Sequence, residues 1–427
     1  MNTSLLAATL AAVVASTLAG CDRPAGESAP QAQAPDKESA AAGAPAPDAT
    51  AAAPATPPTD FNQLAQRLVT QSAAVKEGDL VWISGRPHDA ALLESIAVEV
   101  RKAGAFPTIQ YSSDELSKRL FFDVPAQYDS QADGWGTVLA EAADVVINLD
   151  NGTSENLFEG ADPKRVAARG KANEAIGQAF MRNNVRTVEV GNNLYPTPWR
   201  AERFGMDEAA LSRMFWEGVN LDYAELEARG EAVRKALAGG NEVHITHPAG
   251  TDLRLRVQGR PVLVSDGVLS AADIERGGAS AAVYLPAGEV YTTPVPGTAE
   301  GTLVVPHAYY RGKAVDNLTL TFQGGQVTAL SGEGPGFADM KADYDAVEDE
   351  RKARFAFFDL GINPNVALPA ESRVGNWVPA GTVTVGTGNN TWAGGDNSVP
   401  HSITASLPGA SVTLDEKPIV DAGELKL

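Results

Sequence analysis

Residues 79–84 read DLVWIS and residues 106–111 read FPTIQY, two short runs rich in branched and aromatic side chains. Between them, apolar side chains recur from about residue 89 to residue 103 at the spacing of one helix face. Parallel strands need a crossover connection of this kind, and it is usually a helix. The segment therefore predicts a strand, helix, strand unit of an α/β fold.

The same order is repeated further along the chain. Residues 144–149 (DVVINL) and 185–190 (VRTVEV) are apolar runs on either side of a helical pattern over about 163–182. Runs that are apolar throughout are typical of strands covered on both faces. We therefore predict an N-terminal α/β domain with a mainly parallel sheet.

Two further helices are predicted before the character of the chain changes. Asp207 is a candidate N-cap for the first, and the glycine pair at positions 239 and 240 closes the second near Ala238. We place a domain boundary there, so that the α/β domain covers residues 59–238.

Residues 239–427 are predicted to form a second, mostly β domain, which carries the candidate metal site. Short strands separated by turns are expected at 242–246, 253–257, 281–285, 303–305, 318–322 and 327–330. One helix, at about 337–352, precedes a strand at 355–360.

The start of the chain predicts export and lipid attachment. Residues 5–16 are an apolar run of signal-peptide length, and residues 18–21 read LAGC, which resembles a bacterial lipobox. We expect residues 1–20 to be a lipoprotein signal peptide and Cys21 to be the lipidated residue. An uncleaved anchor or a soluble start is the alternative.

Residues 21–58 are rich in alanine and proline and nearly lack branched or aromatic side chains, so we expect a disordered tether between a membrane and the folded part. Asp22 follows the lipidated cysteine. By resemblance to enterobacterial lipoproteins, an aspartate there implies retention at the inner membrane, facing the periplasm.

Composition excludes several classes of function. The chain has 34 Lys plus Arg against 54 Asp plus Glu, a net charge of -20, which argues against a nucleic-acid partner. Its single cysteine rules out a disulfide framework and a thiolate metal site. No Gly-x-Ser-x-Gly elbow is present. Among the five histidines, His244 and His247 are expected on opposite faces of one strand, so we interpret them as structural.

A family resemblance is carried by residues 285–294, which read LPAGEVYTTP, followed by Glu300 and Gly301. This segment resembles the signature of the thermophilic aminopeptidase family of metallopeptidases (aminopeptidase T and S type). Its leucyl aminopeptidase-like branch also contains 2,5-dihydroxypyridine dioxygenase. Supporting segments are 246–253 (THPAGTDL), 195–197, 205–206 and 359–364 (DLGINP), and the resemblance runs from about residue 75 to the C-terminus.

The resemblance implies metal ligands at Glu289, Asp359 and His401. Asp359 stands where the family has a glutamate. Two other ligand positions are changed: Thr384 stands where the family has a histidine, and Ile403 stands where it has an aspartate. A two-carboxylate, one-histidine set predicts one divalent ion, zinc, manganese or iron, rather than a metal pair.

Two functions follow from this ligand set. The first is a metal-dependent aminopeptidase of the cell envelope that removes N-terminal residues from peptides. The second is a catalytically inactive relative that binds a ligand or partner in the former substrate cleft. Ring cleavage of the dioxygenase type ranks last, because that branch relies on the same missing ligands. His307 and Glu371 remain open as replacement ligands, and the resemblance implies a homodimer.

Overall fold

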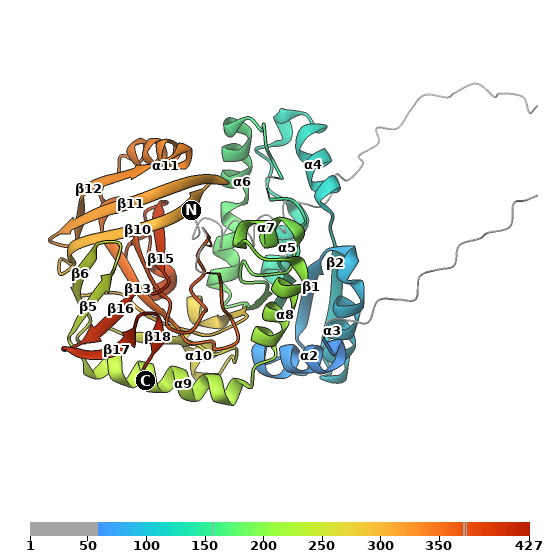
Figure 1. Ribbon diagram of the computed structural model, residues 1–427. Helices are drawn as coiled ribbons and strands as arrows, with labels where there is room; N and C mark the ends of the chain where they lie inside the picture. The colour runs from blue at the N-terminus through green and yellow to red at the C-terminus, as the bar shows by residue number, and fades with distance from the viewer. Residues whose placement is uncertain (1–58, 156, 370–371, 373) are drawn as a thin grey trace, which may run out of the picture.

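The computed structural model describes residues 59–155, 157–369, 372 and 374–427. Its N-terminal part is an α/β layer built on a five-stranded parallel sheet, and two antiparallel sheets follow (Figure 1). This confirms the predicted fold class. The predicted signal peptide, the lipidated Cys21 and the tether lie outside the described residues.

The parallel sheet has the strand order β2-β1-β3-β4-β8. Its strands are β1 (Leu80–Gly85), β2 (Phe106–Tyr111), β3 (Val145–Leu149), β4 (Arg186–Val190) and β8 (Ala282–Leu285). The helices are α2 (Phe61–Arg67), α3 (Ala90–Lys102), α4 (Asp114–Phe122), α5 (Gly134–Ala142), α6 (Pro163–Arg182), α7 (Pro198–Phe204), α8 (Glu208–Val219), α9 (Tyr223–Gly239), α10 (Ala271–Arg276) and α11 (Pro335–Ala346).

Both faces of the inner strands β1 and β3 are covered, which explains why these two strands are largely apolar. On one face, Trp82 of β1 stacks on Phe180 of α6, with ring centroids 6.2 Å apart. On the other face, Ile83 and Ile147 belong to the main core together with Leu92 of α3.

The two antiparallel sheets fill the C-terminal half of the chain. The larger has the order β12-β11-β10-β6-β5-β16-β17-β18, and the smaller has the order β15-β14-β13-β9-β7. Strands of the larger sheet are β5 (Glu242–His247), β6 (Thr251–Arg256), β10 (Glu300–Tyr310), β11 (Lys313–Gln323), β12 (Gln326–Glu333), β16 (Ser411–Leu414), β17 (Lys417–Asp421) and β18 (Glu424–Leu425). Those of the smaller are β7 (Val262–Ser265), β9 (Glu289–Thr292), β13 (Phe355–Gly361), β14 (Val383–Gly388) and β15 (Ser402–Leu407).

Most of the predicted helices are confirmed, and their ends follow from capping. Asp207 caps α8 by accepting a hydrogen bond from the Ala210 amide at 2.8 Å. The predicted helix at 337–352 is shorter than expected, because Val347 is extended and α11 ends at Ala346.

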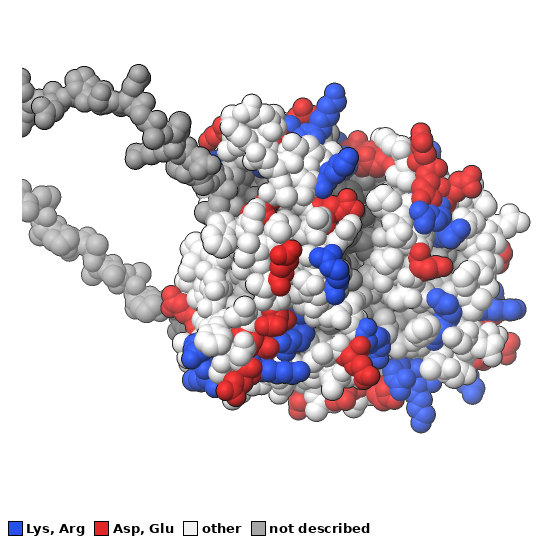
Figure 2. Space-filling model, turned by 180° about the vertical axis from the view of Figure 1, so that it is seen from behind, with Lys and Arg blue, Asp and Glu red and all other residues white. Residues whose placement is uncertain are grey.

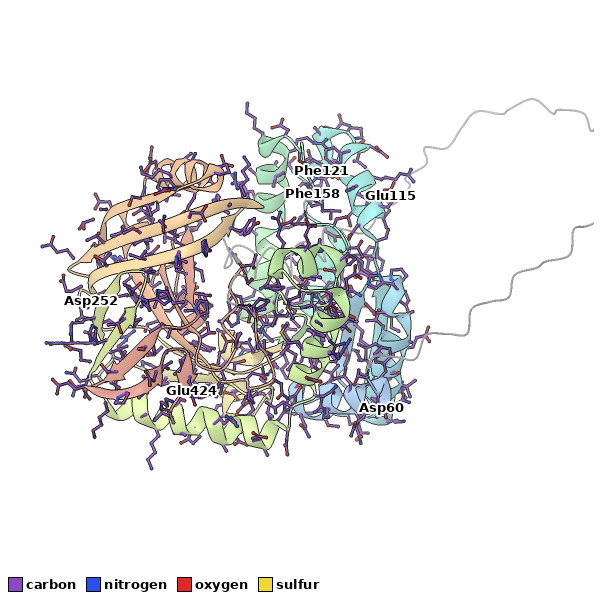
Figure 3. All side chains as sticks on the ribbon, viewed as in Figure 1. Asp60, Glu115, Phe121, Phe158, Asp252 and Glu424 are labelled. Carbon is purple, nitrogen blue, oxygen red and sulfur yellow. The ribbon has the colours of Figure 1, made fainter. Side chains whose placement is uncertain are left out.

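The sequence did not predict α4 and α5, although both have polar N-caps, Ser113 and Asp133. Part of their apolar surface is exposed, which weakens the apolar periodicity. The ring of Phe121 in α4 packs against Phe158 at 5.0 Å, and this contact holds α4 against the loop that precedes α6 (Figure 3).

Strand β8 joins the two parts of the molecule. Its residues were predicted as a strand of the β-rich domain, but β8 pairs with β4 and completes the parallel sheet, with Val188 opposite Val283. The chain then enters β9 of the smaller antiparallel sheet. The domain boundary after residue 238 stays a prediction.

A closed network of charges lies at the carboxyl ends of β3 and β4. Arg200 Nη2 is 2.5 Å from Asp150 Oδ2, and Arg200 Nη1 donates to the Asp150 and Tyr195 carbonyl oxygens at 3.1 and 3.3 Å. Burial raises the pKa of the nearby Glu189 to about 8, the charge of Asp150 adds to this shift, and Arg200 opposes it. These acidic groups therefore share a buried cation.

The surface carries mixed charge. On the face shown in Figure 2, acidic and basic side chains are interspersed over the described residues. Within the described ranges, the helices are too short or too polar to cross a membrane.

Candidate ligand site between the sheets

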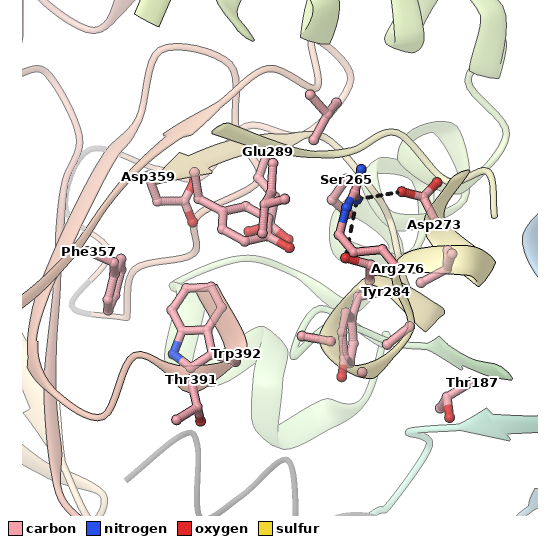
Figure 4. Close-up of a pocket in the computed structure, with 18 of the residues that line it drawn as sticks. Thr187, Ser265, Asp273, Arg276, Tyr284, Glu289, Phe357, Asp359, Thr391 and Trp392 are labelled. Atoms are coloured by element: carbon pink, nitrogen blue, oxygen red, sulfur yellow. Dashed lines mark hydrogen bonds and ion pairs between the residues drawn. The ribbon is translucent and has the colours of Figure 1, made fainter. Parts of the chain in front are cut away.

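A cavity of about 410 Å³ lies between the smaller antiparallel sheet and the β4–β8 edge of the parallel sheet. Figure 4 shows Glu289, Asp359 and Phe357 on one side, and Thr187 of β4 across from them. Residues of α6, α10 and the loop 389–392 also line it. The cavity therefore occupies the junction at which β8 leads into β9.

The segment 285–294 forms this junction, and its glycine is required by close packing. Gly288 has φ +134°, and a Cβ there would lie 2.5 Å from the Cβ of Asn363. Asn363 is fully buried, its Nδ2 donates to the Ala287 carbonyl at 2.7 Å, and the Ile362 amide donates to the Gly288 carbonyl at 2.8 Å. The segments 285–294 and 359–364, which both support the family resemblance, therefore hold each other in place. Their contact also fixes the start of β9.

This junction places two carboxyl groups side by side. In the β9–β13 ladder, Glu289 is opposite Gly361 and Asp359 is opposite Tyr291, so both acids point to the cavity face. The Asp359 carboxyl hydrogen-bonds to that of Glu289, which also bonds to Ser265. Two of the three predicted ligands are therefore in direct contact.

Burial controls the chemistry of this pair. It raises the pKa of Glu289 to about 7, while the hydrogen bonds from Asp359 and Ser265 oppose the shift. Burial also raises the pKa of Asp359 well above its ordinary value, and the charge of Glu289 adds to this effect. Burial therefore favours a proton shared by the two carboxyl groups, and Asp359 Oδ1 is buried with no hydrogen-bond partner among the described residues.

No cation neutralises the pair. Of the described residues that line the cavity, Arg276 is the only one with a positive charge. Its Nη1 is 3.1 Å from Asp273 Oδ1 and 3.2 Å from Ser280 Oγ, so this guanidinium is already paired (Figure 4).

His401, the third predicted ligand, is not among the residues that line the cavity. Its ring packs edge-on against Tyr344 of α11 at 5.5 Å. Burial lowers the pKa of His401 to about 4, and the charge of Lys352 contributes in the same direction, so the ring is neutral near pH 7. The structure keeps it apart from Glu289 and Asp359.

The two changed ligand positions also lack metal-binding groups. Thr384 lies opposite Asp359 in the β13–β14 ladder, but its Oγ1 is 3.0 Å from Ser406 Oγ. Ile403 belongs to the main hydrophobic core, whereas its neighbours Ser402 and Thr404 line the cavity.

Of the two replacement ligands left open by the sequence, His307 does not complete the set. His307 Nδ1 is 3.1 Å from Asp316 Oδ1 on the β10–β11 hairpin, away from the cavity lining, and Glu371 lies outside the described residues. His244 and His247 make local contacts, with a carboxylate and a backbone carbonyl respectively. They behave as structural histidines.

The donor set around the pair does not fit a catalytic metal. Such a site uses three protein ligands and keeps a position open for water or substrate. In the part of the chain that the structure describes, no three His, Cys, Asp or Glu side chains are grouped to hold an ion. The neighbours of the pair are hydroxyl groups and aromatic rings, and hydroxyls are weak ligands for these ions.

An aromatic wall beside the pair was not predicted as part of the site. The rings of Tyr291 and Trp392 are 5.3 Å apart, and those of Phe357 and Trp392 are 4.7 Å apart at 70°. The position of Tyr291 could have been inferred, because it lies two residues after Glu289 in one strand. Trp392 comes from a loop whose path only the structure shows.

Comparisons with known proteins agree with this architecture. A search of curated proteins gave no match. The structure of wild-type AmpT from Thermus thermophilus superposes with a TM-score of 0.63 and 17% identity, covering 86% of this chain and 99% of that one. That of 2,5-dihydroxypyridine dioxygenase from Pseudomonas putida KT2440 gives 0.54 and 16%, covering 87% and 98%. At these identities the likeness shows the fold.

Residues 59–336 match the model of the family described as thermophilic metalloprotease (M29). The match covers well over half of the chain, including the junction segment and Glu289. Asp359, Thr384 and His401 lie beyond its end. The family is metal-dependent, whereas no third ligand lies beside the acidic pair in the part of the chain that the structure describes. The chain belongs to the thermophilic metalloprotease (M29) family.

Proposed function

We propose that this M29 member binds a small organic ligand in its cavity and does not hydrolyse peptides by metal-dependent chemistry. One observation carries the proposal: Glu289 and Asp359 lie side by side in a cavity of about 410 Å³, and the described residues supply no third ligand beside them. The volume lies within the usual range of small-molecule sites, about 300–1,000 Å³.

Loss of ligands weakens a metal site steeply. Each ligand contributes to affinity, and even changes in the groups that support the ligands cost about 10–100-fold. Here the histidine and aspartate positions of the family are occupied by Thr384 and Ile403, and Ile403 is buried in the main core. A rearrangement of β15 would be needed to bring another donor to the pair.

Aminopeptidase activity is the second candidate. Family membership favours it, as does the contact between two predicted ligands in one cavity. It implies peptide substrates, with one zinc, manganese or iron ion at Glu289, Asp359 and His401. His401 would then have to leave its packing against Tyr344.

Metal content and peptide hydrolysis, measured on the same preparations, separate the two candidates. The full-length chain and its Glu289→Gln variant would be incubated with zinc, manganese or iron, desalted, and tested for bound metal and for release of N-terminal residues from a peptide mixture. We expect no stoichiometric metal and no release that depends on Glu289. One ion per chain, with release lost in Glu289→Gln, would establish the aminopeptidase instead.

We also propose that the chain is an exported lipoprotein anchored through Cys21, on the inner membrane facing the periplasm. The lipobox-like LAGC at 18–21 and Asp22 support this. Labelling with a radioactive fatty acid should mark the wild type and not Cys21→Ser, and Asp22→Ser should move the protein to the outer-membrane fraction. Equal labelling of both proteins would contradict the anchor.

The homodimer remains a proposal from the family resemblance. Light scattering on the full-length protein in detergent, corrected for bound detergent, should give twice the chain mass of 44.6 kDa. A monomer mass at all concentrations would contradict it.

A further inference from the structure

We infer that the cavity recognises a protonated amine on an apolar body: the ammonium group binds the Glu289–Asp359 pair, and the body packs on the aromatic wall of Tyr291, Phe357 and Trp392. This inference rests on the proposed binding function and specifies the class of ligand.

The first support is an unmet hydrogen bond. Asp359 is 2% exposed, it lines the cavity, and its Oδ1 has no partner. A buried polar atom without a partner is destabilising, so a native structure usually supplies one. An ammonium group carries three donors and no acceptor, so it suits a site at which two carboxyl side chains line the cavity together.

The second support is the charge of the cavity. Its lining contains four carboxyl groups, those of Asp266, Asp273, Glu289 and Asp359, and the single guanidinium of Arg276. Arg276 is paired with Asp273 at 3.1 Å, so the other three acids face the cavity without a cation. A cationic ligand beside these carboxyls favours their ionised form, whereas an anion would be repelled by it, so the lining selects for positive charge.

The third support is the aromatic wall. Trp392 touches both Tyr291 and Phe357, and all three rings line the cavity next to the acids. Aromatic faces attract cations and also provide flat apolar contact, with tryptophan the strongest of the three. A carboxylate beside aromatic faces therefore suits an organic ammonium better than a hydrated metal ion, which presents polar water to the wall.

Three probes of similar shape test the inference: phenethylamine, 2-phenylethanol and 3-phenylpropionate, which end in a cation, a neutral hydroxyl and an anion. Isothermal calorimetry on the full-length chain should show saturable binding of the amine, about 10–100-fold tighter than that of the alcohol, as for a hydrogen bond to a charged group. The anion should not bind.

Isosteric variants test whether the preference for the amine over the alcohol comes from Glu289 and Asp359. Glu289→Gln and Asp359→Asn should each reduce the amine-over-alcohol ratio to near one while keeping the shape of the cavity. Trp392→Ala should weaken amine binding by about fivefold to tenfold, and Trp392→Phe should weaken it by less. Glu115→Gln, which removes the same charge from the surface of α4, should behave like the wild type (Figure 3).

Equal binding of amine and alcohol, or no amine binding at millimolar concentration, would overturn the inference. The metal and peptide measurements decide the proposed function independently. If the alcohol binds with the same affinity to the wild type and to both carboxyl variants, the protein binds ligands without recognising an amine. Metal binding together with peptide release would contradict both proposals.

Discussion

Two groups of acidic side chains near the junction of the sheets, Asp150 with Glu189 and Glu289 with Asp359, differ in one respect. Asp150 and Glu189, at the ends of the parallel strands, share the guanidinium of Arg200. Glu289 and Asp359, at the edge of the cavity, share only a proton. A buried network that includes its own cation is complete without a ligand, whereas an acidic pair that lacks one still has capacity to bind. The comparison therefore separates a structural site from a recognition site.

Tyr284 of β8 lies between the two groups. Burial raises its pKa well above the ordinary value, and the charges of Glu189, Tyr291 and Glu289 all add to the effect. The substitutions below act on one group at a time.

The largest effect is expected from the closed network. Arg200→Met leaves Asp150 and Glu189 buried without their cation, and should lower the free energy of unfolding by about 3–5 kcal/mol. Urea denaturation measures this change. Arg229→Met, which breaks an exposed helical ion pair at 3.0 Å, is the matched control and should cost less than about 1 kcal/mol. Equal losses of unfolding free energy in the two variants would show that the network around Arg200 stabilises the fold no more than an exposed ion pair does.

A smaller loss of stability is expected at the junction of β8 and β9, which positions the Glu289–Asp359 pair. In Gly288→Ala the new Cβ would meet Asn363 at 2.5 Å, so the variant should lose about 1–3 kcal/mol of stability and also lose amine binding. Gly160 also has a positive φ, +79°, but a Cβ there would have no atom within 4 Å, so the Gly160→Ala variant measures backbone strain alone. If both variants bind amine equally, the junction does not position the pair.

The smallest expected effect is on the pH dependence of stability. The folded pKa of Glu289 is raised from its ordinary 4.5 to about 7 by burial, so its neutral form is favoured in the folded state. The stability from this group is full below pH 4.5 and is lost as the pH rises through about 7.

Between pH 6 and 8 the wild type should therefore lose on the order of 1 kcal/mol that Glu289→Gln does not lose. Glu189→Gln should instead flatten the curve toward about pH 8. Thermal unfolding across this range measures both variants, and wild-type and Glu289→Gln curves of the same slope would contradict the raised pKa.

The fold could be predicted in large part because burial leaves a direct mark on the sequence. Strands β1 and β3 are covered on both faces, so their runs are apolar throughout and are typical of a parallel sheet. The partner of β8 could not be predicted in this way. A run of four residues has the same pattern beside a parallel or an antiparallel neighbour, and only tertiary structure sets it beside β4.

The candidate site was predicted in part for similar reasons. Glu289 and Asp359 follow from short motifs on adjacent strands, and strand register brings them together. The position of His401 depends on α11, since Tyr344 packs on its ring. The contribution of Trp392 depends on a loop, for which the sequence has no periodic pattern.

The most direct test of the account is the metal stoichiometry of the full-length protein, measured by mass spectrometry after incubation with zinc, manganese or iron and removal of excess ion. The Glu289–Asp359 pair should retain no stoichiometric metal, and the metal content of Asp359→Asn should equal that of the wild type. One ion per chain in the wild type that is lost in Asp359→Asn would contradict the account and restore the pair as part of a metal site.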